Sequence, residues 1–246
     1  MLARRRSVTL IGPLRYVPAL SPRHTWRKLV PELTAARVRA AFLETADLAA
    51  SVLARPEVAR FWEAPSALRL LSVRGLAGHL VRGATTVEVY LDRPEPEGEP
   101  ISAAEYYARA LPENEDITTP IHTAIRERGE GQAAAGPERL AADAAAACAR
   151  LRERLASEPT TRLMSVYKET VLRLDDYLRT RLVELTLHVD DLCVSIGVPT
   201  PELPVAARAA AIETLLEVAR LRHGDLAVLR ALARRERDPV GALRVM

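Results

Sequence analysis

The sequence predicts an all-α protein, a helical bundle with additional helices near its C-terminus. Alanine, leucine and arginine dominate the 246 residues, whereas phenylalanine and tryptophan are scarce. Apolar residues recur every three or four positions over several long segments, which is the period of an amphipathic helix. The β-branched residues lie mostly inside these patterns, so they do not indicate a sheet. Together these observations favour one domain built of helices.

The N-terminal 33 residues differ from the rest of the chain. They show no sustained period and contain four prolines, so we expect a loosely attached extension over residues 1–33. The helical domain should follow over residues 34–236, and a short tail should occupy residues 237–246. Within the domain, the segment 92–100 is too rich in proline for regular structure and is expected to be a linker.

Local signals place the ends of individual helices. Thr34 and Ser72 are suitable N-caps, and Gly197 is a typical helix end. The expected helices run from Thr34 to about Val52, Ser72 to about Leu91, Ser102 to Ala110, Pro120 to Arg128, Gly136 to Ser157, Asp175 or Asp176 to Gly197, Pro204 to Arg222, and Asp225 to Arg235. Residues 160–172 alternate only partially, which is compatible with an irregular arm or a short strand.

Charge and cysteine content narrow the class of protein. The formal net charge is +3, and acidic and basic residues interleave along the expected helices, so no nucleic-acid partner is expected. No segment approaches the roughly 18 uninterrupted apolar residues of a membrane span. Cys148 and Cys193 show neither C-x-x-C spacing nor a disulfide framework, which is typical of a reducing compartment. We therefore expect a cytoplasmic protein without a nucleic-acid or membrane partner, and the oligomeric state, monomer or homodimer, is left open.

The segment from Tyr177 to Gly197 carries polar residues where a buried helix normally has apolar ones. At about 100° per residue, one narrow stripe contains Tyr177, Arg181, Glu184, His188, Asp191 and Ser195. Apolar residues flank the stripe, on one side Val183, Leu187 and Val194, so the stripe should face the core. The residues expected to face solvent are Arg179, Thr186, Asp190 and Cys193. Buried carboxylates and imidazoles need partners or a metal, because leaving them unpaired is costly.

Glu184 and His188 are four residues apart, so their side chains point the same way on a helix and can share one ion. His79 is the best third ligand, since it lies on an inward-facing stripe of the 72–91 helix. Two imidazoles and one carboxylate form a recurrent catalytic zinc set with an open position, and they would also accept nickel, iron or cobalt. The alternative is a metal-free hydrogen-bond network in which Arg181 neutralises Glu184 and Asp191 holds His188.

Small residues surround His79, because Gly75 and Gly83 lie one helical turn before and after it. A glycine inside a helix costs roughly 1 kcal/mol relative to alanine, so both glycines are expected to leave space beside the imidazole. We assign Gly83 to the ligand that completes the coordination of the metal. The remaining histidines are weaker candidates for the site: His24, His122 and His223.

Three segments carry a resemblance to a known family. They are W-x-x-P-S at 62–66, S-V-R-x-L-x-x-H-L at 72–80 and R-L-V-E-L-T-L-H-V-D-D-L at 181–192. They resemble the mycothiol-dependent maleylpyruvate isomerase family, which belongs to the wider DinB-like metal-binding four-helix bundles. The resemblance extends over about Thr34 to Arg235. In the founding isomerase a C-terminal α/β domain follows, whereas the residues after Gly197 here have mostly helical patterns.

The resemblance implies a DinB-like four-helix bundle that binds a divalent metal, usually zinc, through His79, Glu184 and His188. It also implies an isomerase or S-transferase that acts on a small-molecule substrate and uses a low-molecular-weight thiol, mycothiol, as co-substrate. Asp191, one turn below His188, would accept the ring N–H that is not on the metal. Arg181 would neutralise the site or bind a substrate carboxylate; the alternative for both residues is an ion pair with each other. The rival hypothesis is a non-catalytic bundle that acts as a structural or partner-binding module.

Overall fold

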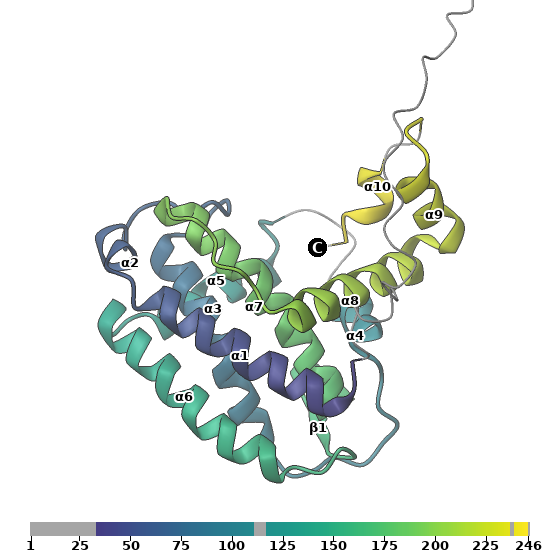
Figure 1. Ribbon diagram of the computed structural model, residues 1–246, viewed down its shortest axis with the longest axis horizontal. Helices are drawn as coiled ribbons and strands as arrows, with labels where there is room; N and C mark the ends of the chain where they lie inside the picture. The colour runs from purple at the N-terminus through teal and green to yellow at the C-terminus, as the bar shows by residue number, and fades with distance from the viewer. Residues whose placement is uncertain (1–32, 111–116, 237–238, 246) are drawn as a thin grey trace, which may run out of the picture. The chain divides into compact units, whose positions relative to one another are not determined.

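The computed structural model describes residues 33–110, 117–236 and 239–245 (Figure 1). Residues 1–32 of the expected extension lie outside the described residues, as do 237, 238 and 246 of the expected tail. The described part contains ten α-helices and one two-stranded hairpin, so the prediction of an all-α bundle is confirmed. None of the described helices is long and apolar enough to cross a membrane.

Four long helices form the bundle: α1 (Ala35–Leu53), α3 (Val73–Leu91), α6 (Pro137–Ser157) and α7 (Leu174–Ile196). Helices α1 and α3 each contact both α6 and α7, so the four close into a ring. Fully buried residues from each of them fill the interior, namely Phe42, Leu76, Leu151 and Leu178. Burying such side chains is worth roughly 1.5–3 kcal/mol each, and this burial holds the helices together.

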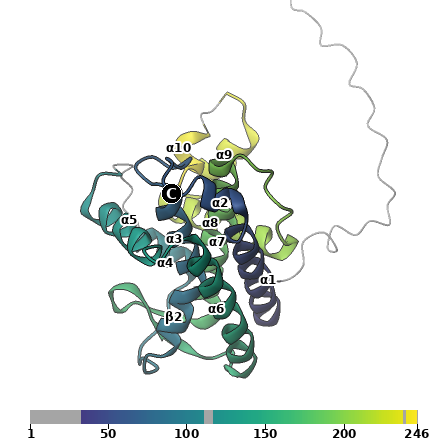
Figure 2. The ribbon, with the colours of Figure 1, turned by 90° about the vertical axis from the view of Figure 1, so that its left-hand side faces the viewer.

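Shorter elements cover the bundle. They are α2 (Pro56–Arg60), α4 (Ala103–Ala110), α5 (Pro120–Gln132), the hairpin strands β1 (Leu163–Ser165) and β2 (Val171–Arg173), α8 (Val205–His223), α9 (Asp225–Ala233) and α10 (Val240–Leu243). Figure 2 shows α5 on the side of α3 away from α1, and α5 packs along α3. Helix α8 packs against α7 and α4. The hairpin confirms the short strand considered for residues 160–172.

Two expected N-caps are confirmed. The hydroxyl oxygen of Thr34 accepts a hydrogen bond from the Arg37 amide, and that of Ser72 accepts one from the Gly75 amide. Gly197 ends α7 in the left-handed conformation at φ +70°, where glycine is favoured.

The start of α7 differs from the prediction. Its N-cap is Arg173, the last residue of β2, rather than Asp175 or Asp176. The hairpin leads directly into the helix, so both aspartates lie in the first helical turn. Asp175 there accepts a hydrogen bond from Arg39 of α1, with an N–O distance of 2.8 Å, and this ties the beginning of α7 to α1.

The predicted solvent face of α7 was partly wrong. Thr186 and Cys193 are buried, whereas Leu187 and Val194 are 40% and 59% exposed. The reason is that α7 has α1, α3 and α8 as neighbours. Because helices pack against α7 on several sides, the residues that are buried differ from those that a single apolar face would predict.

Candidate metal centre

Helices α3 and α7 bring together the three predicted metal ligands. His79 of α3 and Glu184 and His188 of α7 offer ligand atoms that all lie within 4.8 Å of one another. The Nε2 atom of His79 is 3.2 Å from Glu184 Oε2, and the Nε2 atom of His188 is 3.4 Å from the same oxygen. The two imidazole rings meet edge to face with centroids 4.7 Å apart. The Nε2 atoms of both histidines and the Glu184 carboxylate therefore face one small volume.

Asp191 orients the His188 ring. Its Oδ2 atom lies 2.9 Å from His188 Nδ1, one helical turn along α7. A ring that donates its Nδ1–H to this carboxylate turns its Nε2 toward Glu184 and His79. This is the arrangement by which carboxylates commonly fix metal-binding histidines.

Tyr107 of α4 orients Glu184, and sequence reasoning missed this residue. Its hydroxyl is buried and lies 2.9 Å from both Glu184 Oε1 and the Thr180 carbonyl, so it shares one proton between two acceptors. This contact leaves Oε2 to face the two imidazoles. No local pattern identifies Tyr107, because the contact depends on α4 reaching α7.

The protonation of the cluster follows from burial and hydrogen bonding. Burial by itself would raise the pKa of Glu184, but hydrogen bonds from His188 and His79 hold that pKa well below its ordinary value. Burial would lower the pKa of His188, but hydrogen bonds to Asp191 and Glu184 raise it to about 9. For His79 burial dominates and lowers the pKa. A cation that took Nε2 of His188 would therefore displace a proton near neutral pH.

The donor set fits a divalent cation better than it fits a closed hydrogen-bond network. Two imidazole nitrogens and one carboxylate oxygen are the ligand types of mononuclear zinc sites. With Nε2 of His79 turned toward Glu184, its Nδ1 is buried and has no hydrogen-bond partner in the described structure, so the protein does not close a hydrogen-bond network around this ring. Buried polar atoms of this kind call for an explanation, since most are satisfied.

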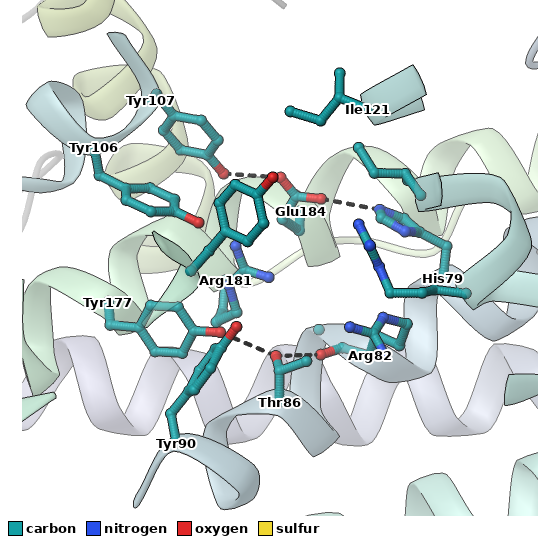
Figure 3. A pocket seen from close by; sticks show the side chains of 14 residues that line it. His79, Arg82, Thr86, Tyr90, Tyr106, Tyr107, Ile121, Tyr177, Arg181 and Glu184 are labelled. Carbon is teal, nitrogen blue, oxygen red and sulfur yellow. Dashed lines mark hydrogen bonds and ion pairs between the residues drawn. The ribbon is translucent and has the colours of Figure 1, made fainter. Parts of the chain in front are cut away.

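A cavity of about 260 Å³ opens beside the cluster (Figure 3). Its lining residues are His79, Arg82, Gly83, Thr86, Tyr90, Tyr106, Tyr107, Ile121, Ile125, Arg128, Tyr167, Tyr177, Arg181 and Glu184. His79 and Glu184 thus face both the cluster and the cavity, so a ligand in the cavity can approach the metal position. His122 is not among these residues, although two of its neighbours on α5 are.

Arg181 and Asp191 do not pair with each other. The Arg181 guanidinium lies over the Tyr177 ring, 4.9 Å from its centroid, and its Nε donates to Thr180 Oγ1 at 3.1 Å. Asp191 is bound to His188 instead. The structure places Asp191 against the His188 ring and Arg181 in the cavity wall.

The space expected beside the two glycines is present only in part: Gly83 lines the cavity next to His79, whereas side chains fill the space beside Gly75, so the expectation for Gly75 is wrong. A Cβ atom at Gly83 would lie 2.7 Å from Leu185 Cδ2, and one at Gly75 would lie 2.6 Å from Glu130 Oε1. Gly83 lines the cavity and at the same time allows α3 to approach α7 closely. Its binding of a coordinating ligand stays a prediction.

Tyr107→Phe should lower the affinity for a divalent cation by about tenfold. This is the lower limit of the loss, about 10–100-fold, that is typical when a residue that orients a metal ligand is removed. Phenylalanine preserves the buried ring but removes the hydroxyl that holds Glu184. Zinc titration against a competing chelator measures the change. Tyr106→Phe is the matched control, because the Tyr106 hydroxyl makes no hydrogen bond within the described chain. Equal affinities in the parent and the Tyr107 variant would contradict this positioning role.

The fold and the cluster define a class: helical bundles with two histidines and one glutamate at the wall of a cavity. The sequence profile of the mycothiol maleylpyruvate isomerase N-terminal domain matches residues 42–193, which is more than half of the chain. The chain therefore belongs to this family, and the resemblance found in the sequence is confirmed. No curated protein and no solved structure matches the chain.

Proposed function

We propose that the protein is a metal-dependent, thiol-using enzyme, an isomerase or S-transferase with mycothiol as co-substrate. The divalent cation, with zinc as the expected ion, would be held by His79, Glu184 and His188. The observation that carries the proposal is the convergence of these three ligand atoms at the wall of a cavity. Membership of the maleylpyruvate isomerase family supports the use of a thiol.

A divalent cation at this position would lower the pKa of a bound thiol and present it as a thiolate near neutral pH. Neighbouring side chains hold the proposed ligands in a fixed orientation. Asp191 fixes the imidazole of His188, and Tyr107 fixes the carboxylate of Glu184. Arg181 places a cation in the cavity wall, where it can stabilise negative charge that develops on the electrophile.

The reaction type follows from what a thiolate does to a conjugated electrophile. The sulfur lone pair forms a C–S bond, and the π electrons of the carbon–carbon double bond move onto the conjugated carbonyl oxygen as an enolate. Rotation about the resulting single bond and return of the electrons expel the thiolate, which gives cis-to-trans isomerisation. Protonation of the carbon instead retains the C–S bond, which gives S-transfer. Both outcomes need the same site.

Cobalt-substituted protein provides the test. Adding mycothiol or N-acetylcysteine should produce a saturable sulfur-to-cobalt charge-transfer band, and N-acetylserine, which lacks the sulfur, should not. Cobalt content is measured in the same samples. Protein with about one cobalt per chain and no such band with either thiol would contradict the enzyme proposal and favour the non-catalytic alternative, in which the metal is structural.

A further inference from the structure

Three arginines from three helices line the cavity without a carboxylate partner. Arg82 lies on α3, Arg128 on α5 and Arg181 on α7, and none of them makes an ion pair within the described residues. Several arginines outside the cavity do pair with acidic residues, as Arg150 does with Glu88 at 2.7 Å. The shared feature of the three is therefore a guanidinium at the cavity without a salt bridge to a carboxylate of the described chain.

The acid nearest to these arginines is already engaged. Glu184 is the acidic residue among those that line the cavity. Its Oε1 is bound by Tyr107 and its Oε2 faces His79 and His188. The carboxylate thus belongs to the metal cluster. Its charge favours the charged form of Arg181, although no salt bridge joins the two side chains. Arg82 and Arg128 have no carboxylate of this kind among the described residues at the cavity.

Gathering three like charges costs free energy. Burial, together with the charges of Arg128 and Arg181, lowers the pKa of Arg82. Arg181 is held in place by its contact with the Tyr177 ring and its hydrogen bond to Thr180, and the negative charge near it is that of Glu184, which also serves the metal cluster. An oxyanion in the cavity would offset the mutual repulsion of the three arginines, because guanidinium groups form strong charge-assisted hydrogen bonds to carboxylates and phosphates.

The rest of the cavity is aromatic and apolar. Five tyrosines and two isoleucines contribute to its lining. Figure 3 shows Tyr90, Tyr106 and Tyr177 gathered on one side, across from His79 and Arg82. Tyr90 and Tyr177 meet edge to face with centroids 5.5 Å apart. Such walls accept a flat unsaturated or aromatic body by ring contacts, and the hydroxyls of Tyr90 and Tyr106 have no hydrogen-bond partner in the described chain.

We propose that Arg82, Arg128 and Arg181 form an oxyanion subsite for a substrate with a small planar body and a carboxylate or phosphate head group. The inference rests on the proposed function and names the substrate class of the same site. The arginines would hold the head group while the planar body lies along the tyrosines. This orientation presents the rest of the molecule to the wall formed by His79 and Glu184.

Calorimetric titration of the zinc-loaded protein at constant ionic strength tests the subsite. The probes are benzoate, its uncharged isostere benzamide, and inorganic phosphate. Benzoate should bind at least about tenfold more tightly than benzamide. Arg82→Gln or Arg128→Gln should lower the ratio of the benzoate affinity to the benzamide affinity by about tenfold. Arg230→Gln, at an exposed arginine of α9 outside the cavity, should change nothing. Circular dichroism and zinc content verify that each variant is folded and loaded.

The source of the oxyanion is decided by the two anionic probes: preference for phosphate over benzoate identifies a phosphate head group, and the reverse identifies a carboxylate. Equal affinity for benzoate and benzamide without phosphate binding, or full binding in both arginine variants, would overturn the subsite.

Metal-free protein, prepared with a chelator, separates this inference from the proposed function. Anion binding that persists without zinc supports the subsite even if thiol binding fails. Anion binding that disappears with zinc assigns the anion to the metal and leaves the proposed function standing.

Discussion

His188→Ala should lower the affinity of the protein for a divalent cation by more than about 100-fold. Loss of a residue that only orients a ligand already costs about 10–100-fold, and loss of a ligand should cost more. The same result is expected for His79→Ala, because the two imidazoles face the same carboxylate oxygen from different helices. The parent protein should carry about one ion per chain, and both variants almost none.

Elemental analysis after dialysis against a weak chelator provides the measurement. His223→Ala is the matched control, since His223 is exposed at the end of α8 and far from the cluster in the chain. Its metal content should equal that of the parent. Parent-like metal content in both His79→Ala and His188→Ala would mean that the ion, if any, binds elsewhere.

Gly129→Ala should destabilise the fold by roughly 1–3 kcal/mol or more, the usual cost of overpacking. A Cβ atom at this position of α5 would lie 2.5 Å from the carbonyl oxygen of Gly75 on α3. Backbone atoms cannot move aside as the end of a side chain can, so α5 would have to shift. Because α5 supplies Ile121, Ile125 and Arg128 to the cavity, the shift should also weaken ligand binding there.

Gly131→Ala, two residues further along the same helix, is the control. A Cβ atom at Gly131 would have no neighbour within 4 Å, so this change should be neutral or stabilise the protein by up to about 0.5–1 kcal/mol. Chemical denaturation of the two variants gives the free energies of unfolding. Two equal values would contradict the close contact of α3 and α5.

The ends of several helices could be predicted because they depend on neighbours in the chain. The hydroxyls of Thr34 and Ser72 reach amides only three residues ahead, and Gly197 needs only its own backbone conformation. The spacing of Glu184 and His188 is equally local, since side chains four residues apart share a helix face. The beginning of α7 could not be located in this way, because it is set by the hairpin that precedes it.

The faces of α7 show where periodicity stops being informative. A period of 3.6 residues identifies an apolar side of a helix, but it does not predict how many other helices pack against it. Cys193 and Thr186 are buried because several helices surround α7, and Leu187 is exposed although it flanks the polar stripe. The glycines near His79 are a similar case: their small size was evident, but the side chains that occupy the space were not.

By itself, the sequence determined the all-α class, the helices that carry His79, Glu184 and His188, and the family to which the chain belongs. These properties follow from composition, short-range spacing and motifs that lie within single helices. Only the tertiary structure decided that Tyr107 holds Glu184 and that Arg82, Arg128 and Arg181 share one cavity. Those contacts join helices distant in the chain, and their distances depend on how the helices pack, which no local pattern of residues specifies.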